Sequence, residues 1–521
     1  MNRRELIKLG AVAGGLSIAG VPLHALAQGK KGGVINVLVQ PEPPGLMIGI
    51  TQNGPTQMIS GNIYEGLLRY SDKIEPMPAL ATAWTISPDG RVYTFKLKHD
   101  VTWHDGKPFT AADVVFSADV FLRKTHARLR ANLAAVDTIR ALDPYTVEFK
   151  LKYPFGPFIG IFEVGSMPMV PKHIYEGTDF LTNPANATPI GTGPLKFKEW
   201  VRGSYIKLVR NDAYHEPNVP LVDAVYYQII PDAASRAAAF ESGKVDIVPG
   251  GAVEYFDVAR LSKLPGVQVT TKGWEFFAPQ SWLWINNRKA PMDKVKFRQA
   301  MAFAIDRDAI AKIAWYGNAK TATGPFNSHI KYYSNDVTHY PHDLAKAKQL
   351  LAESGYKGET LRLLPLPYGE TWQRSAEFVR QNLQQAGIKI EMTPTDVAGW
   401  GERLDKWDFD IAFTYVYQYG DPALGVARNY TSENIAQGSP FNNVEGYRNP
   451  KVDELFQAGA REIDPAKRAA IYLAVQKILL DDMPVLWMHE LNFPTLYRTR
   501  VNNPINSGIG LNDGLGRAWV S

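Results

Sequence analysis

Residues 225–248 read VYYQIIPDAASRAAAFESGKVDIV, and this stretch decides the fold class. Val225–Ile230 is an apolar and aromatic run that predicts a strand. Asp232 stands where a helix N-cap is expected, and the helix that follows should stop at Gly243. Val245–Val248 then returns as a second strand. A strand, a helix and a strand in succession are typical of an α/β protein.

The alternation of strands and helices continues on both sides of this unit. Val34–Val39 is almost continuously apolar, as in a strand covered on both faces. Residues 93–97 and 147–151 alternate apolar and polar side chains, so each predicts a half-buried strand. From about residue 293 the apolar residues mostly recur at helical spacing, and Asp464-Pro465 is a cap that opens a further helix. We therefore expect mixed α/β lobes.

Composition narrows the possible functions. The chain has 521 residues, which suits several domains of about 150 residues each. Hydrophobic residues make up 45% and charged residues 21%, so wholesale disorder is excluded. The net charge of +5 is too small to argue for a nucleic acid or an anionic membrane as a partner. Cysteine is absent, which excludes disulfides, thiolate metal sites and cysteine nucleophiles.

The first 27 residues have the pattern of an export signal. Arg3-Arg4 is followed by a weakly apolar stretch, Leu9–Val21, that is too short to span a membrane. Ala25-Leu26-Ala27 supplies a cleavage pattern, so we expect the mature chain to begin near Gln28. The segment resembles a twin-arginine signal, which carries folded proteins out of the bacterial cytoplasm. Cleavage would lower the net charge to +3 and leave a soluble periplasmic protein without a lipid anchor.

Motifs for common catalytic and cofactor sites are incomplete. His339 and His342 flank a proline in a predicted loop, and such a pair is more often solvated than metal-bound. Residues 191–194 begin like a dinucleotide loop but lack the third glycine. His104 and Asp105 are adjacent, yet neighbours on an extended chain point apart and Asp-Gly favours a turn. We therefore expect no metal site, no cofactor and no catalytic residues.

Several short blocks, taken in order, point to one family. The segments IYEGLL at Ile63–Leu68 and PALATAW at Pro78–Trp84 resemble the opening of the bacterial extracellular solute-binding proteins of the dipeptide, oligopeptide and nickel class, family 5. Further similar blocks lie at 89–106, 109–116, 191–211, 236–247, 297–307 and 446–455. Each block alone is weak, but together they cover nearly the whole mature chain.

The resemblance implies a two-lobed periplasmic binding protein fold that closes on a ligand and delivers it to the membrane permease of an ABC transporter. One lobe would comprise residues 28–283 and 491–521, with an inserted subdomain at about 73–190. The other lobe would comprise residues 284–490. Two strands at these boundaries would form the hinge, and the lobes would bend about it around a trapped ligand.

An aromatic segment is the best candidate for the ligand site. Ile411, Phe413, Tyr415, Tyr417 and Tyr419 alternate along the chain, so they line one face of a predicted strand. They fit a buried core strand. They fit equally well a stacking wall for a ligand, because tyrosine places hydroxyls where a core would favour Leu or Ile. The residues alone leave both interpretations open.

The resemblance favours the ligand wall. In peptide-binding relatives this strand carries a cleft tryptophan, and Tyr415 matches it when the alignment is anchored on Asp421-Pro422. Gln418 stands where those relatives have an aspartate for the peptide's α-amino group, and it cannot offset an ammonium charge. Leu366 stands where dipeptide binders have an arginine for the carboxylate. A free zwitterionic dipeptide is therefore not favoured, whereas a modified peptide or sugar conjugate is.

Further tryptophans could complete this wall. Trp282 is the best placed of them, because it lies just before the proposed hinge. A naked nickel ion is not expected as ligand, since the sequence offers no compact set of metal ligands. The nine candidate ligand-binding residues are Trp274, Trp282, Leu366, Trp372, Trp400, Tyr415, Tyr417, Gln418 and Asp421.

Two functions are compatible with these observations. The first, which we favour, is a monomeric periplasmic binding protein that captures a small polar ligand without catalysis and works with the permease subunits of an ABC importer. The ligand would be a peptide, a modified peptide or a sugar conjugate. The second is an exported cofactor-dependent enzyme, because twin-arginine export often serves proteins that fold around cofactors. The missing cysteines, scattered histidines and absent phosphate loops weigh against the second.

Overall fold

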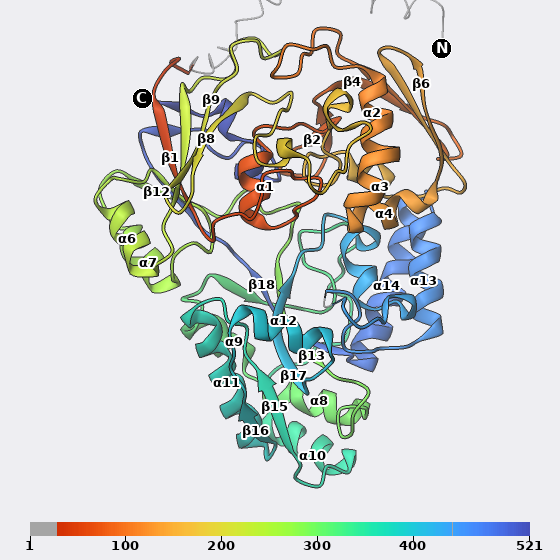
Figure 1. The fold of residues 1–521 in the computed structure, drawn as a ribbon. Helices are drawn as coiled ribbons and strands as arrows, with labels where there is room; N and C mark the ends of the chain where they lie inside the picture. Colours follow the sequence, from red (N-terminus) through yellow and green to blue (C-terminus); the bar gives the residue numbers. More distant parts are fainter. Residues whose placement is uncertain (1–28, 440) are drawn as a thin grey trace, which may run out of the picture.

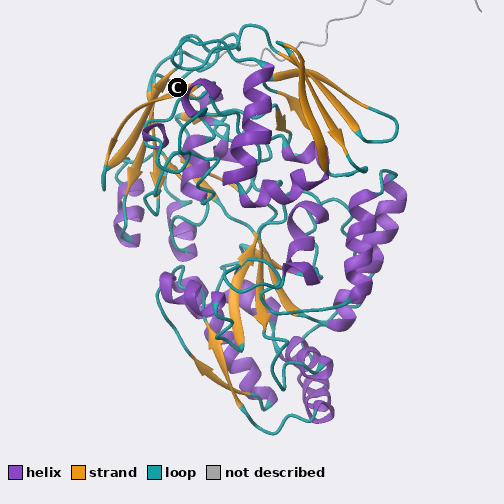
Figure 2. Ribbon diagram, turned by 45° about the vertical axis from the view of Figure 1, so that its right-hand side comes forward, coloured by secondary structure: helices purple, strands orange, loops and turns teal. Residues whose placement is uncertain are grey.

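The computed structural model describes residues 29–439 and 441–521, so the predicted export signal lies outside the described residues. Two large sheets, one of seven strands and one of six, form the centres of two lobes, termed lobe I and lobe II. A four-stranded sheet forms an additional part of lobe I, and Figure 2 shows it apart from the two larger sheets. Figure 1 shows lobe II at the lower end of the molecule. The predicted α/β class is confirmed.

The strand–helix–strand unit predicted from the opening stretch lies in the seven-stranded sheet. β10 (Ala224–Ile229) is followed by α6 (Ala233–Glu241) and then by β11 (Ile247–Val248). β1 (Val34–Val39) pairs in parallel with both β10 and β11, so it lies between them. The unit is confirmed, although β11 is shorter than the predicted strand.

Local signals set the two ends of α6. The Asp232 carboxylate accepts a hydrogen bond from the Ser235 N–H at 2.7 Å, as its predicted role of N-cap requires. Gly243 has a φ of +80°, which glycine adopts at little cost, and the chain turns there toward β11.

Further elements complete lobe I around this unit. The seven-stranded sheet has the order β12-β19-β11-β1-β10-β9-β8. Its remaining strands are β8 (Leu195–Val201), β9 (Tyr205–Arg210), β12 (Val267–Thr270) and β19 (Thr495–Arg498). Two short antiparallel pairs are β2 (Leu68–Tyr70) with β3 (Pro76–Pro78) and β20 (Val501–Asn502) with β21 (Trp519–Val520). The helices are α1 (Gly54–Ser60), α5 (Lys172–Tyr175) and α7 (Tyr255–Leu261).

The additional part of lobe I is built on the four-stranded antiparallel sheet. Its strands in spatial order are β4 (Ala81–Ile86), β5 (Val92–Leu97), β7 (Thr146–Leu151) and β6 (Val136–Asp143). The predicted alternation in β5 and β7 is confirmed by their burial patterns. Between β5 and β6 lie α2 (Ala111–Val115), a π-helix (Phe116–Leu122), α3 (Arg123–Thr125) and α4 (Ala127–Asn132). All these elements lie inside the predicted insertion, residues 73–190.

Lobe II is built on the six-stranded sheet. Its strands in spatial order are β14 (Ala319–Thr321), β18 (Val485–Leu491), β13 (Gln280–Ile285), β17 (Ile411–Val416), β15 (Thr360–Leu364) and β16 (Lys389–Met392). Its helices are α8 (Val295–Ala304), α9 (Arg307–Ile313), α10 (Leu344–Ser354), α11 (Glu370–Ala386), α12 (Val397–Asp405), α13 (Pro450–Arg461) and α14 (Pro465–Asp482). The predicted rise in helix content after residue 293 is therefore confirmed.

The chain passes between the two lobes twice. It runs from β12 in lobe I to β13 in lobe II through residues 271–279, and it returns from β18 to β19 through residues 492–494. These two stretches are termed the crossing segments. β12 pairs with β19, and β13 pairs with β18, so the crossing segments run side by side. The predicted boundaries at 283 and 491 fall inside β13 and at the end of β18, a few residues from the crossings. The limits of the lobes and their hinge stay predictions.

The aromatic strand is shorter than predicted. β17 ends at Val416, whereas the alternating pattern extends to Tyr419. Tyr419 has a φ of +52°, so the chain has left the extended conformation before that residue. Every residue of β17 except Tyr415 is buried, so the strand is covered on both faces. The prediction of a nine-residue strand is wrong at its C-terminal end.

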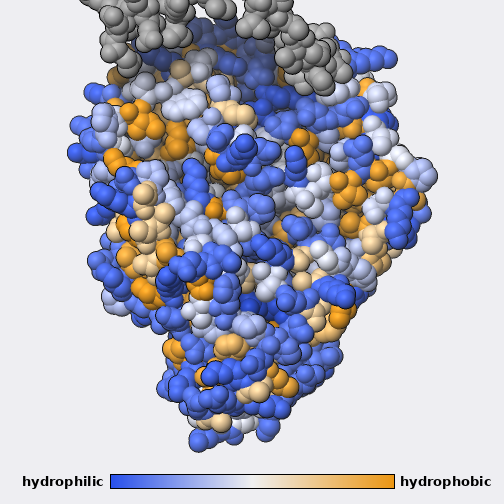
Figure 3. Space-filling view, turned by 180° about the vertical axis from the view of Figure 1, so that it is seen from behind, coloured by the Kyte–Doolittle hydropathy of each residue, from blue (hydrophilic) through white to orange (hydrophobic). Residues whose placement is uncertain are grey.

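The cores of the two lobes meet at the crossing segments. Trp274 and Tyr417 pack against the buried apolar residues of both lobes. On the outside, Figure 3 shows apolar side chains scattered among hydrophilic ones over the back of the molecule. Within the ranges that the structure describes, no helix combines the length and apolarity that a membrane span requires.

Two fully buried histidines are held in the neutral form. His126 Nδ1 accepts a hydrogen bond from the Leu129 N–H at 3.2 Å, and Nε2 lies 3.2 Å from the Gly165 carbonyl oxygen. A carbonyl oxygen can only accept, so Nε2 carries the single ring proton. Burial lowers the pKa of His126 to about 3 and that of His489 to about 4.

We expect the free energy of unfolding to fall as the pH is lowered from about 6.5, the ordinary pKa of histidine. Below this pH the unfolded chain takes up protons that the folded chain does not, so each histidine removes at most about 1.4 kcal/mol per pH unit until its folded pKa is reached. Urea unfolding at a series of pH values measures this slope. His126→Gln should reduce the slope, because the substituted chain has one fewer histidine that is neutral when folded and protonated when unfolded. An unchanged slope in His126→Gln would contradict the conclusion that His126 is neutral in the folded protein.

Candidate functional site

An aromatic cluster lies where the chain crosses between the lobes. Tyr415, near the end of β17, stacks on Trp372 of α11 with ring centroids 5.5 Å apart and an interplanar angle of 24°. Its ring also meets Phe493 edge-on, with centroids 5.9 Å apart. Phe493 belongs to the second crossing segment, so Tyr415 links the sheet of lobe II to that crossing.

Tyr417 extends this cluster toward lobe I. Its ring lies 6.4 Å from that of Trp274, at an interplanar angle of 21°, and 5.3 Å from that of Phe277. Trp274 in turn packs edge-on against Phe493 at 5.0 Å. Two rings of the first crossing segment therefore pack against Tyr417, and Trp274 links them to the second crossing segment. Trp274, Phe277, Trp372, Tyr415, Tyr417 and Phe493 are termed the junction cluster.

The tyrosine hydroxyls of the junction cluster stay protonated. Burial, and after it the neighbouring Tyr368, raise the pKa of Tyr415 to about 12. Burial also raises the pKa of Tyr417 well above its ordinary value. A neutral phenol donates and accepts hydrogen bonds while its ring presents an apolar face. The junction cluster can therefore stack against a flat part of a small molecule and bind its polar groups.

Gln418 is fully buried and makes its side-chain hydrogen bonds within lobe II. Its Nε2 donates to Gln280 Oε1 and, at 3.0 Å, to the Pro325 carbonyl oxygen. Its Oε1 accepts from the Asn327 N–H at 2.9 Å. Its backbone N–H donates to the Phe277 carbonyl oxygen at 2.7 Å. Gln418 thus fastens the first crossing segment and a neighbouring loop to the end of β17, and a direct contact of Gln418 with a ligand stays a prediction.

Asp421 takes part in a buried ion pair. Its two carboxylate oxygens lie 3.0 and 3.1 Å from Nη2 and Nη1 of Arg468, which belongs to α14. The side chains of Asp421 and Arg468 are only 7% and 5% exposed. The same carboxylate accepts from the Ala423 N–H at 3.0 Å. The charge of Asp421 is therefore matched within the chain, and the residue ties the segment after β17 to α14.

Three other candidate residues lie in the core of lobe II. Trp282 on β13 is fully buried and packs against Tyr430, with ring centroids 5.6 Å apart. Trp400 on α12 packs against Trp284 at 6.3 Å. Leu366 is 1% exposed and belongs to the same core. Of the nine candidates, the structure brings together Trp274, Trp372, Tyr415 and Tyr417, with Gln418 beside them.

Glu254 connects the two lobes and was not among the candidates. It directly precedes α7 in lobe I, and its carboxylate accepts from the backbone N–H groups of Glu370 and Thr371 at 3.1 and 3.3 Å. The Thr371 hydroxyl donates to it at 2.9 Å. Glu370 and Thr371 open α11, so a carboxylate of lobe I caps a helix of lobe II. Gly369 has a φ of +105°, and a Cβ at this position would collide with Glu254.

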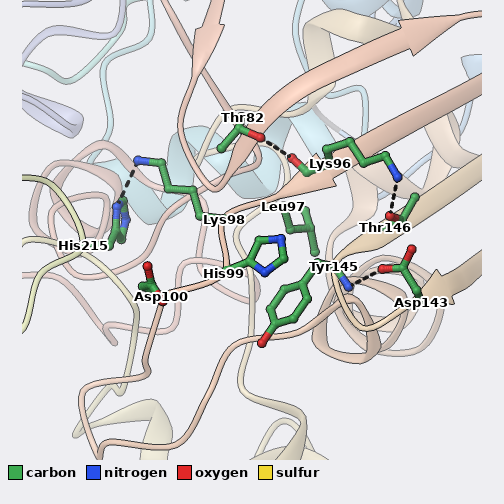
Figure 4. A pocket seen from close by; sticks show the side chains of 10 residues that line it. All are labelled: Thr82, Lys96, Leu97, Lys98, His99, Asp100, Asp143, Tyr145, Thr146 and His215. Atoms are coloured by element: carbon green, nitrogen blue, oxygen red, sulfur yellow. Dashed lines mark hydrogen bonds between the residues drawn. The ribbon is translucent and has the colours of Figure 1, made fainter.

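An open pocket of about 540 Å³ lies in the four-stranded part of lobe I. Figure 4 shows Lys98 directed at His215 and Lys96 directed at Thr146, whereas Asp100 is joined to no other residue drawn. Lys98 Nζ lies 3.1 Å from His215 Nδ1, and Lys96 Nζ donates to the Thr146 hydroxyl at 2.9 Å. No residue of the junction cluster lines this pocket. Within residues 29–439 and 441–521, no group of three or more His, Cys, Asp or Glu side chains is arranged to hold a metal ion.

Comparison with known proteins identifies the family. Residues 75–437 match the family described as bacterial extracellular solute-binding proteins, family 5 Middle. The chain is 28% identical over 449 residues to the glutathione-binding protein GsiB of Escherichia coli (strain K12), covering 82% of this chain and 83% of GsiB.

Solved structures agree with this match. The chain is similar to the ABC transporter substrate-binding protein CtaP from Listeria monocytogenes, with a TM-score of 0.83, 28% identity, and coverage of 94% of this chain and 100% of CtaP. It is also similar to the binding protein AgaA of A. tumefaciens R10 in complex with agropinic acid, with a TM-score of 0.80, 27% identity, and coverage of 94% and 99%.

The chain therefore belongs to the family 5 bacterial extracellular solute-binding proteins. This confirms the family resemblance, the two-lobed binding-protein fold and the function of capturing a ligand for import by an ABC transporter.

Asp421→Asn should lower the free energy of unfolding by about 3–5 kcal/mol, because it leaves Arg468 charged and unpaired in the core. Adding Arg468→Met removes the stranded charge, so the double variant should recover a substantial part of this loss. Urea unfolding of the wild type, both single variants and the double variant measures the coupling. A double variant as unstable as the sum of the two single changes would contradict a mutually dependent pair.

Glu254→Gln should shift the protein without ligand toward more open lobes. The lost carboxylate cap on α11 is worth about 1 kcal/mol, which changes the ratio of closed to open molecules about fivefold. Small-angle X-ray scattering should then give a larger radius of gyration. Glu377→Gln is the matched control, because Glu377 lies on the same helix but pairs with Arg380 inside lobe II. A radius of gyration unchanged by Glu254→Gln would show that this carboxylate does not hold the lobes together.

Proposed function

We propose that the protein captures a small polar solute in the periplasm, between its lobes at the junction cluster, and presents it to the permease subunits of its transporter. The observation that carries this proposal is the stack of Tyr415 on Trp372 beside the two crossing segments. Trp274 and Tyr417 pack against the cores of both lobes, so a molecule held by these rings contacts both lobes at once. Such a ligand favours the closed arrangement, because it gains more contacts there than in the open one.

The proposed ligand is a modified peptide or sugar conjugate rather than a free dipeptide. The side chain of Gln418 makes its hydrogen bonds to groups within lobe II, and Leu366 carries no charge. A zwitterionic dipeptide would gain no opposite charge from either position, and burying an unpaired charge is costly. The relatives GsiB and AgaA are named with glutathione and agropinic acid respectively, so ligands differ between members of the family.

The proposed location rests on the sequence of the first 27 residues. Paired arginines, a short apolar stretch and a small-x-small motif support twin-arginine export with cleavage near Ala27. The description of the family as extracellular agrees with this location. The mature protein is proposed to act as a monomer.

The proposed binding is not followed by catalysis and requires no cofactor. GsiB and CtaP, the relatives compared above, are named as binding proteins. The raised pKa values keep Tyr415 and Tyr417 protonated, so neither is a general base or an activated nucleophile at neutral pH.

Tyr415→Ala should weaken ligand binding about tenfold or more, because it removes one member of the ring stack, while the protein stays folded. Native mass spectrometry of protein from its own host identifies the ligand, and calorimetry measures one-to-one binding. Tyr316→Ala, an exposed tyrosine of lobe II, is the control and should bind normally.

Two results would count against the proposal. Normal binding by Tyr415→Ala would remove the junction cluster as the site. A radius of gyration that does not fall when the ligand is added would contradict capture by closure of the lobes.

A further inference from the structure

Tyr419 lies next to the junction cluster, and two arginines approach its ring. The Tyr419 centroid is 6.2 Å from that of Tyr417. The guanidinium carbon of Arg128 lies 4.0 Å from the Tyr419 centroid, and that of Arg428 lies 5.9 Å from it. Arg128 belongs to α4 in the additional part of lobe I, whereas Arg428 belongs to a short helix at 427–429 in lobe II. Cations from opposite lobes therefore meet on one ring.

Neither arginine has an acidic partner among the residues that the structure describes. Arg128 Nη1 donates to the Ser166 hydroxyl at 3.0 Å, and Arg428 Nε donates to the Gly425 carbonyl oxygen at 3.4 Å. Both side chains are half-buried, so they are shielded from bulk water yet reachable. This arrangement differs from that of Arg468, whose buried charge is matched by Asp421.

The positive charges of Arg128 and Arg428 are not balanced by ion pairs with neighbouring carboxylates in the part of the chain that the structure describes. Burial lowers the pKa of Arg428, and the charge of Arg128 lowers it further. Glu163 is buried nearby, accepts from the Ser166 hydroxyl and the Gly165 N–H, and feels the charge of Arg128, but it forms no ion pair with that arginine. The neighbouring Tyr419 phenol raises the pKa of Arg428, but no carboxylate within the described ranges does so.

The backbone on both sides holds the two cations in place. In lobe I, His126 accepts from the Leu129 N–H and so caps the start of α4, which carries Arg128. In lobe II, the Asn429 side chain donates to the Gly425 carbonyl oxygen at 3.1 Å and fixes the turn that carries Arg428. The hydrogen bonds of the two guanidinium groups to Ser166 and Gly425 restrict the side chains as well, so they lose less conformational entropy on binding an anion than mobile surface side chains do.

We propose that Arg128 and Arg428 together bind an oxyanion group of the transported solute, a carboxylate or a phosphate, beside the junction cluster. This inference rests on the proposed function and adds the charge class of its ligand. Guanidinium groups bind both oxyanions through paired N–H donors. The aromatic rings would then hold the remainder of the solute.

Because the two arginines come from opposite lobes, the binding of an anion should also favour closure of the lobes. With no anion present, closure brings two like charges to the same ring, which is unfavourable. An anion between them reverses the sign of the interaction, so it binds the closed arrangement more tightly than the open one. Removal of either arginine should therefore weaken both the binding of the anion and its effect on the lobes.

Thermal unfolding of the mature protein with citrate or with inorganic phosphate tests this site. Each anion is compared with sodium chloride at the same ionic strength, which separates binding from general screening. Wild-type protein should melt at a higher temperature with at least one of the two anions than with chloride, and the anion that acts distinguishes a carboxylate from a phosphate site. Arg428→Gln and Arg128→Gln should each raise the apparent dissociation constant about tenfold or more.

Arg202→Gln is the matched control, because Arg202 also lies over an aromatic ring, that of Trp200 at 3.4 Å, but is 61% exposed on lobe I. It should respond to the anions as the wild type does. Wild-type protein that responds to neither anion beyond chloride, or an equal response in the wild type, Arg128→Gln and Arg428→Gln, would overturn the inference. Circular dichroism of each variant checks that it is folded. If one of the two variants does not fold, the other is sufficient for the test.

Scattering separates the failure of this inference from failure of the proposed function. If the natural ligand closes the lobes of the wild type and of Arg428→Gln equally well, capture stands and the oxyanion site is wrong. If the anions bind through the arginines but the natural ligand leaves the radius of gyration unchanged, the site stands and capture by closure is wrong.

Discussion

The antiparallel pairing of strands on either side of the two crossings is the constraint on which the rest of the structure depends. β12 pairs with β19 in lobe I, and β13 pairs with β18 in lobe II, so the crossing segments must run side by side. These pairings use backbone hydrogen bonds, which leaves the side chains of the crossing segments free to form a site. β17 pairs with β13 in a register that sets Tyr415 opposite Ser281. This register therefore places Tyr415 and Tyr417 next to the aromatic rings of the crossing segments.

Local patterns in the sequence predicted the elements whose signals lie within one short segment. Asp232 marks the start of α6, and the alternation around Phe95 marks a strand with one face in the core. The same reasoning extended β17 too far, because alternation reports the type of side chain and not the presence of a partner strand. β13 begins at Gln280, opposite Val416, so no residue of β13 is left to pair with Tyr417 and those that follow.

The candidate site was predictable where the chemistry of one residue type was enough. A row of tyrosines is unusual in a core, and it led to Tyr415 and Tyr417. A tryptophan gives no such distinction. Its position before the proposed hinge favoured Trp282, yet the fold packs Trp282 against Tyr430 in the core and stacks Trp372 on Tyr415. The contact that Glu254 makes between the lobes could not be predicted from the sequence, because the groups it binds lie 116 residues or more away in the chain. An arginine without an acidic partner likewise cannot be told from a paired one before the partners are placed.

The carboxylate of Glu254 at the start of α11 affects how long a captured molecule is retained. The contact joins groups of the chain itself, so it contributes the same free energy to a closed receptor whether the space between the lobes is empty or filled. By linkage it strengthens the retention of every solute by the same factor and discriminates between none of them. Selectivity must then arise from the side chains that touch the solute, while Glu254 influences the residence time that all solutes share.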